Sequence, residues 1–201
     1  MTTTQPILDG IVLAAGQSQR MGRPKALLEV GTETFLEHAL RVMREGGCRS
    51  LTLVLAAEDA RIEEIAQQYD ARVLFNPDPA SEQFASIQLA MASLPEDSVA
   101  AAIMPVDCPL VTAASIEALA EVAAKSRRPL VLPMYNGVGG HPLIVCRSFY
   151  AELLAAHPVE GMRTLIIDRG HQVEIVNLAD PGVLIDIDTE QEYDRFIVNP
   201  E

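Results

Sequence analysis

A glycine-containing stretch near the N-terminus carries residue types suited to binding a phosphate chain. Its sequence is Leu13-Ala14-Ala15-Gly16-Gln17-Ser18-Gln19-Arg20-Met21-Gly22-Arg23-Pro24-Lys25. Small residues let a backbone approach a ligand closely, and the N–H groups can face phosphate oxygens. Arg20 would add a rigid fork of donors and Lys25 a point charge. The stretch is therefore a candidate triphosphate site. The alternative is a tight turn with incidental basic residues on its exposed face.

The charge of the whole chain also favours a phosphate-bearing ligand. Fifteen basic residues against 28 acidic ones give a net charge of −13, which would repel nucleic acid and anionic membranes over most of the surface. Between Gly10 and Leu28, however, there is no acidic residue, while Arg20, Arg23 and Lys25 are present. We therefore expect a small, highly charged anion as the partner, and neither nucleic acid nor a membrane.

Two common phosphate loops do not match this stretch. A Walker loop has four residues between its glycines and then Lys and Ser or Thr, whereas five residues separate Gly16 from Gly22, and Arg23-Pro24 follows. The dinucleotide fingerprint G-x-G-x-x-G is also absent. Neither an ordinary kinase or ATPase nor an NAD enzyme is indicated.

Aspartates at two places could hold a metal ion. Asp107 follows an apolar run at the expected carboxyl end of a buried strand, and Mg²⁺ prefers oxygen ligands together with substrate phosphates and water. The alternative is a turn aspartate before Pro109. If the later run is also a strand, Asp186 and Asp188 project from one face of it and can approach one cation. We prefer Asp188 to Asp186. The alternative is that Asp188 or Thr189 caps the last helix.

Repeated apolar runs indicate the elements that would position these residues. They are rich in Val, Ile and Leu, as buried parallel strands are. The runs lie at 11–15, 51–55, 72–75, 100–106, 129–133, 142–146, 173–176 and 183–187. Between them, helices are expected after Thr34, ending at Gly46-Gly47, after Thr112, and around Ile62. We predict an α/β fold with a doubly wound, mostly parallel sheet and helices on both faces, and a loop or hairpin tip at 135–140.

Composition limits the remaining possibilities. The 201 residues, 49% of them hydrophobic, are expected to form one domain spanning 1–201. No apolar stretch is long enough to span a bilayer, and Asp9 interrupts the run that a signal peptide would need, so we expect a cytoplasmic protein. Cys48, Cys108 and Cys146 are widely separated and suggest free thiols, neither a disulfide framework nor a zinc site. Cys108 is interpreted as a packing residue.

The spelling L-A-A-G-x-S-x-R-M-G-x-P-K at 13–25 resembles the signature of the MobA-like nucleoside triphosphate transferases, most closely the molybdenum cofactor cytidylyltransferases. The resemblance implies a Rossmann-like nucleotidyltransferase architecture in which this loop wraps the triphosphate. Phosphate-binding roles then fall on Gly16, Ser18, Arg20, Gly22 and Lys25, with Leu13 and Ala14 beside the base. Ala15 is also assigned to nucleotide binding. Ala15 stands where relatives that use GTP have glycine, which favours CTP.

The same resemblance extends to other parts of the chain. It implies that Asp107 binds the metal and that Asp188 or Asp186 completes the site. Asn76-Pro77-Asp78 and Ser86 match a region that contacts base and ribose, so the resemblance gives Asn76 and Ser86 nucleotide-binding roles. Acceptor-binding roles fall on three residues. They are Gly140 and His141 of the Gly139-Gly140-His141-Pro142 string, and Arg163 at a helix start.

The reaction implied is attack of an acceptor phosphate on the α-phosphorus of CTP, with Mg²⁺ as cofactor and release of pyrophosphate. Arg20, Lys25 and Asp107 would be the catalytic residues, acting by positioning and charge neutralisation. The implied acceptor is molybdopterin bearing molybdenum, and a molybdoenzyme or its chaperone is a candidate partner. Open alternatives are a guanylyltransferase, a sugar-phosphate or polyol-phosphate nucleotidyltransferase, and a noncatalytic module that binds a nucleotide or cofactor.

Overall fold

The computed structural model describes residues 8–16, 23–76, 78, 83–157 and 161–200. These residues form an eight-stranded sheet with the strand order β10-β7-β9-β6-β1-β4-β5, and β8 pairs with β7. Only β8 and β9 pair antiparallel with their neighbours in this sheet, so the predicted mostly parallel sheet is confirmed. The strands are β1 (Leu8–Ala14), β4 (Cys48–Leu55), β5 (Ala71–Phe75), β6 (Ala100–Pro105), β7 (Leu130–Tyr135), β8 (Val138–Gly139), β9 (Leu143–Cys146) and β10 (Val173–Asn177).

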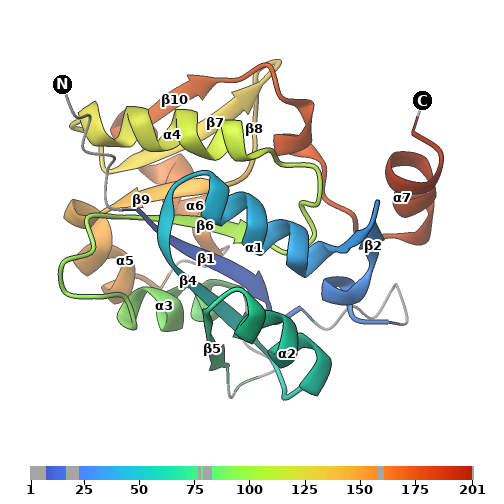
Figure 1. The fold of residues 1–201 in the computed structure, drawn as a ribbon. Helices are drawn as coiled ribbons and strands as arrows, with labels where there is room; N and C mark the ends of the chain where they lie inside the picture. Colours follow the sequence, from blue (N-terminus) through green and yellow to red (C-terminus); the bar gives the residue numbers. More distant parts are fainter. Residues whose placement is uncertain (1–7, 17–22, 77, 79–82, 158–160, 201) are drawn as a thin grey trace, which may run out of the picture.

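Helices cover both faces of the sheet (Figure 1). On one face lie α1 (Phe35–Glu45), α2 (Ala60–Gln68) and α4 (Ala113–Lys125). On the other lie α3 (Gln83–Ala92), α5 (Tyr150–Ala155) and α6 (Gly161–Asp168). Side chains of β1 alternate between the two cores, because Val12 packs with the first group and Ile11 and Leu13 with the second. None of the helices in the described ranges combines the length and the apolar character needed to cross a bilayer.

Local sequence signals set the helix ends as predicted. Thr34 caps α1 in a reciprocal capping box with Glu37, and Gly46 follows the last helical residue. Thr112 caps α4 by accepting a hydrogen bond from the Ser115 N–H. The predicted tip at 135–140 is also confirmed, because β7 and β8 form a hairpin whose turn residues Asn136 and Gly137 both have positive φ.

The first strand begins earlier than the apolar run predicted. It starts at Leu8 and includes Asp9, whose side chain is fully buried. Arg49 and Ser50 on the neighbouring β4 donate hydrogen bonds of 3.0 and 2.6 Å to the Asp9 carboxylate. A charged residue can be part of a buried strand when its charge is paired, whereas burying an unpaired charge is costly. All three cysteines are described and none forms a disulfide, as expected.

The run at 183–187 is not the strand that its apolar character predicted. The chain instead forms a short 3₁₀ helix, η4 (Pro181–Leu184), and continues irregularly to Asp188. Its backbone is paired with loops: Val183 O accepts from His141 N at 2.7 Å, and Ile187 N donates to Asp107 O at 2.8 Å. The prediction failed because a buried connecting segment is as apolar as a strand.

Glycine at 182 is required by this packing. A Cβ there would lie 2.0 Å from the Leu110 carbonyl oxygen, so Gly182→Ala forces the two segments apart. We expect a loss of about 1–3 kcal/mol in the free energy of unfolding, as for other overpacked sites, measured by urea denaturation. Gly170→Ala is the matched control, because no described atom lies within 4 Å of its Cβ position. Equal stability of the two variants would contradict the packing described here.

Candidate functional site

The candidate site lies where parallel strands end at one edge of the sheet. β1 runs into Ala15 and Gly16, β5 into Asn76, and β6 through Val106 into Asp107. The first loop is described up to Gly16 and again from Arg23, so the predicted phosphate-binding residues Ser18, Arg20 and Gly22 lie outside the described residues.

Lys25 joins two carboxylates that are far apart in the sequence. Its Nζ donates a hydrogen bond to Asp107 Oδ2 at 2.7 Å and another to Asp188 Oδ1. The Lys25 side chain is 13% exposed, that of Asp107 22% and that of Asp188 50%. Three predicted site residues, from the first loop, the end of β6 and the C-terminal segment, therefore meet at one place.

The pKa of Lys25 reflects this position. Burial of the ammonium acts to lower the pKa, but hydrogen bonds and charge attraction from Asp107 and Asp188 outweigh it. The pKa consequently lies above its ordinary value of 10.5. Lys25 is thus a fixed positive charge at neutral pH.

Packing of the short helix η1 (Lys25–Leu27) positions the lysine. Ala26 and the following Leu28 are buried, at 3% and 0% exposure, and anchor the turn to the core. Asp107 follows β6, all of whose residues are buried, and the intervening Val106 N donates to Leu13 O at 2.9 Å. The segments that carry the Lys25 ammonium and the Asp107 carboxylate are therefore both anchored to the core.

A helix cap positions Asp188. The Oε2 atom of Glu192 accepts hydrogen bonds from the backbone N–H groups of Asp188 and Thr189, both at 2.9 Å. Thr189 caps α7 (Glu190–Tyr193), as the alternative interpretation of this string proposed. Sequence reasoning missed Glu192, although the Thr-x-x-Glu spacing at 189–192 is typical of a capping box.

The same short helix also contacts the first loop. The Tyr193 hydroxyl donates to Glu29 O at 2.9 Å, and the Arg23 guanidinium lies 5.5 Å from the centroid of the Tyr193 ring. Sequence reasoning missed Tyr193 as well, because nothing in the spacing of the chain places residue 193 beside residues 23–29. The C-terminal segment and the loop that carries Lys25 therefore support each other.

Asp186 and Asp188 do not lie on a strand. Residues 185–188 are irregular, and the two exposed aspartates flank the buried Ile187. Asp186 instead accepts a hydrogen bond from Cys108 Sγ at 3.0 Å and lies near His141. The predicted strand is therefore wrong; Asp188 contacts Lys25, Asp186 contacts Cys108, and an approach of both aspartates to one ion stays a prediction.

Asn76 and Ser86 form a buried pair. Asn76 Nδ2 donates to Ser86 Oγ at 2.9 Å, and Asn76 Oδ1 accepts from Asp78 N at 3.1 Å. Both residues are nearly inaccessible, at 7% and 2% exposure. The two predicted base-side residues are thus brought together, and their hydrogen bond links the end of β5 to α3.

The residues at the end of β1 differ in what they expose. The Leu13 side chain is buried in the core, Ala14 and Ala15 are half-buried, and Gly16 is exposed. A Cβ at Gly16 would meet no described atom within 4 Å, and its φ is not positive. The described surroundings therefore leave open space at this glycine.

The predicted acceptor residues lie on two elements. A Cβ at Gly140 would lie 2.1 Å from Val183 O, so packing alone requires glycine there. Burial lowers the pKa of His141, against the raising effect of Asp186 and Asp107, so the imidazole is neutral. Arg163 is exposed on α6, which packs in the second core with α3 and α5. The structure thus keeps His141 near Asp107, while Arg163 lies on the opposite face of the sheet from α1 and α4.

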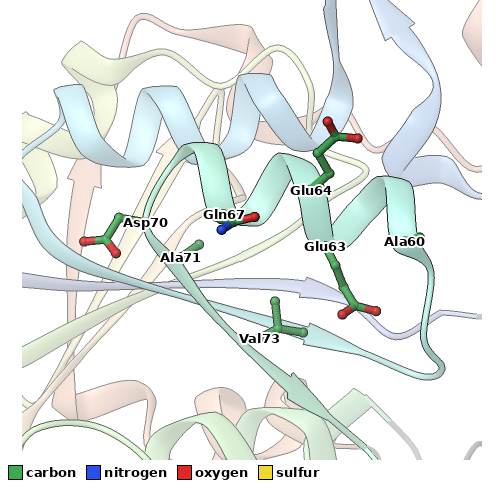
Figure 2. A pocket seen from close by; sticks show the side chains of 7 residues that line it. All are labelled: Ala60, Glu63, Glu64, Gln67, Asp70, Ala71 and Val73. Carbon is green, nitrogen blue, oxygen red and sulfur yellow. The ribbon is translucent and has the colours of Figure 1, made fainter.

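A separate hollow of about 520 Å³ lies between α2 and β5 (Figure 2). Its lining includes the acidic residues Glu63, Glu64 and Asp70 and no basic side chain. A triphosphate would be repelled there, so this hollow is not the candidate nucleotide site.

Comparison with known proteins agrees with the geometry. Residues 10–173 match the family model of the MobA-like NTP transferase domain. The molybdenum cofactor cytidylyltransferase of Escherichia coli K12 is 28% identical, over 92% of this chain and 93% of its own length. A probable molybdenum cofactor guanylyltransferase of Opitutus terrae is 32% identical, over 65% of this chain and 63% of its own.

A solved structure supports the same assignment. The crystal structure of Mycobacterium tuberculosis H37Rv Rv0371c in complex with manganese superimposes with a TM-score of 0.81 at 26% identity, covering 96% of this chain and all of that one. The family match includes the first loop, β6 and Asp107. The chain therefore belongs to the MobA-like NTP transferase family, and it is a nucleotidyltransferase.

Proposed function

We propose that this chain transfers cytidine monophosphate from CTP to the phosphate of a pterin cofactor, releasing pyrophosphate, with Mg²⁺ as the metal. The observation that carries the proposal is the meeting of Lys25, Asp107 and Asp188 beside the first loop. On this proposal the whole chain acts as one domain in the cytoplasm. A molybdoenzyme or its chaperone is the proposed recipient of the product.

The donor set fits a hard divalent cation. Asp107 and Asp188 direct carboxylate oxygens at one cationic atom, Lys25 Nζ, and oxygen is the ligand that Mg²⁺ prefers. Asp107 and Asp188 would hold the ion, which when bound would neutralise charge on the phosphates. With the carboxylates occupied in this way, Lys25 would donate to the triphosphate.

The remaining proposed roles follow from position. Lys25 and Arg20 stabilise the departing pyrophosphate, and the backbone of the first loop, with Gly16, Ser18 and Gly22, orients the triphosphate. Asn76 and Ser86 are assigned to the base side, where their hydrogen bond links the end of β5 to α3. No protein nucleophile is needed, because the acceptor phosphate supplies the attacking oxygen.

Acceptor binding is proposed for Gly140, His141 and Arg163. His141 is neutral and lies close to Asp186, beside the carboxylate pair, so it can donate to or accept from a bound acceptor. Ala15 supports CTP, and the cytidylyltransferase relative matches over nearly the full length of the chain. GTP remains the competing nucleotide because a guanylyltransferase relative matches the chain at 32% identity.

Replacing Asp107 tests the metal site. We expect Asp107→Asn to lower turnover on the order of 100-fold or more, because a transition-state electrostatic partner is lost. Turnover is measured as pyrophosphate release from CTP with Mg²⁺ and molybdopterin. Glu121→Gln, which alters an exposed carboxylate paired with Lys125 on α4, is the control and should keep full activity. Nearly full activity of Asp107→Asn would remove this residue from the mechanism.

Replacing Lys25 should separate metal binding from turnover. In Lys25→Met the two carboxylates lose the ammonium between them, so Mn²⁺ should bind the nucleotide-free protein several-fold more tightly, while turnover falls about 100-fold. Electron paramagnetic resonance of free Mn²⁺ measures the first effect and pyrophosphate release the second. Lys125→Met on exposed α4 should change neither. Weaker Mn²⁺ binding by Lys25→Met would show that the ammonium and the metal do not compete.

A nucleotide panel tests the base preference and the noncatalytic alternative together. A ligand at 100 times its dissociation constant adds about 2.7 kcal/mol to stability, so CTP with Mg²⁺ should raise the melting temperature more than GTP, UTP or ATP at equal concentration. Adding molybdopterin should then release pyrophosphate. A larger shift with GTP would make the chain a guanylyltransferase, and binding without pyrophosphate release would favour a noncatalytic module.

A further inference from the structure

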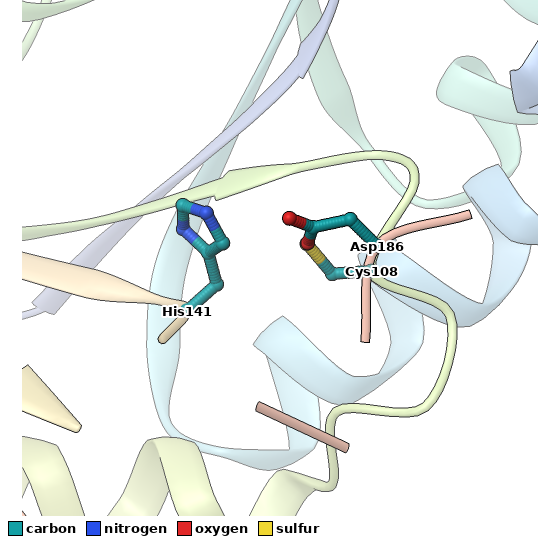
Figure 3. A group of neighbouring side chains, drawn as sticks. All are labelled: Cys108, His141 and Asp186. Carbon is teal, nitrogen blue, oxygen red and sulfur yellow. The ribbon is translucent and has the colours of Figure 1, made fainter. Parts of the chain in front are cut away.

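Three side chains of different chemistry meet near Asp107. Cys108 is buried at the end of β6, His141 precedes β9, and Asp186 lies in the segment before α7. One ligand atom of each lies within 4.8 Å of the others. Figure 3 shows the imidazole of His141 facing the carboxylate of Asp186, with the Cys108 thiol beside that carboxylate.

This group is not explained by the hydrogen bonds of the fold. Cys108 Sγ donates to Asp186 Oδ1 at 3.0 Å, and a thiol is a weak donor. Nδ1 of His141 is buried and has no hydrogen-bond partner among the described residues. Buried polar atoms are nearly always satisfied, so the hydrogen bonds of the fold leave part of the binding capacity of this imidazole unused.

We propose that Cys108, His141 and Asp186 form a second cation site, which binds a borderline-soft divalent ion such as Zn²⁺. Sulfur, nitrogen and oxygen are the protein ligands of Zn²⁺, whereas Mg²⁺ takes oxygen alone. In a tetrahedral site with such bond lengths, neighbouring ligand atoms lie about 3.3–3.6 Å apart. The three ligand atoms lie within 4.8 Å of one another, and Cys108 Sγ and Asp186 Oδ1, now 3.0 Å apart, would separate slightly to reach that value.

Charge also matches. When the ion binds, the Cys108 thiol loses its proton to solvent and the sulfur–metal bond forms. A thiolate, a carboxylate and a neutral imidazole then balance a charge of +2. Three protein ligands leave the fourth tetrahedral position for water or a donor atom of a substrate, as in zinc sites that remain open.

The backbone holds the three ligands in place without any ion. Ile187 N donates to Asp107 O and His141 N donates to Val183 O, so the segment that carries Asp186 is tied to the two segments that carry Cys108 and His141. The close contact of Gly140 with Val183 O fixes the same junction. Such preorganisation is what a binding site needs from its supporting residues.

Cobalt substitution tests this site independently of nucleotidyl transfer. The full chain, without nucleotide, is titrated with Co²⁺, and a thiolate-to-cobalt charge-transfer band is followed in the near ultraviolet. We expect one Co²⁺ per chain at this site, a band that disappears in Cys108→Ser, and a band that remains in Cys146→Ser, the matched control on β9. Zn²⁺ should abolish the band by displacement, and excess Mg²⁺ should not.

Further variants separate this proposal from the proposed function. Asp107→Asn should keep the cobalt band while losing turnover. If Cys108→Ser does not fold, Asp186→Asn, at an exposed position, serves instead and should weaken Co²⁺ binding on the order of 10-fold or more. The proposal is overturned if the parent chain shows no band, if Cys108→Ser keeps it, if Cys146→Ser loses it, or if Asp186→Asn binds Co²⁺ as tightly as the parent.

Discussion

The need to neutralise two converging carboxylates governs this structure. Asp107 and Asp188 reach one place from distant parts of the chain, and the ammonium of Lys25 lies between them. Two like charges about 4 Å apart repel by about 4 kcal/mol at an effective dielectric constant near 20, so the pair needs a cation. In the nucleotide-free protein Lys25 supplies it. On the proposed mechanism Asp107 and Asp188 would hold a divalent ion, and Lys25 would donate to the triphosphate.

The fold makes this convergence possible by bringing the C-terminal segment back over the sheet edge. Parallel strands place the first loop and Asp107 side by side, but the second carboxylate arrives on a segment that belongs to no strand. Gly140 and Gly182 allow that path, because backbone carbonyl groups occupy the positions where a Cβ atom of any other residue would lie. The capping box of α7 then fixes Asp188. The geometry of the site therefore depends on tight backbone packing some distance from the charges.

Much of this could be predicted from the sequence because the signals are local. Thr34 and Thr112 cap their helices with their own side chains, so the helix starts could be read from the sequence. The apolar runs of β1, β4 and β6 were predicted as strands and form strands. Lys25 and Asp107 were identified as site residues from the cationic first loop, from the place of Asp107 after an apolar run and from the family resemblance. The structure brings the two side chains together, and their roles are proposals.

The parts of the fold and of the site that were not predicted depend on contacts between distant segments, which no local sequence pattern indicates. The run ending at Ile187 is apolar because it is buried between loops, and period and composition cannot distinguish that from a strand. Asp186 and Asp188 were consequently placed on a strand that the structure does not contain. Likewise Cys108, His141 and Asp186 are separated by more than thirty positions each, so nothing in their spacing suggests a common site.

The most direct measurement is a crystal structure of this chain with Mn²⁺ and a nonhydrolysable CTP analogue, with the metal located by its anomalous scattering. We expect Mn²⁺ to contact both Asp107 and Asp188, the phosphates to lie against residues 16–25, and Lys25 Nζ to have left the carboxylates for phosphate oxygens. Phosphates bound elsewhere, or a metal that touches neither aspartate, would contradict the central claim.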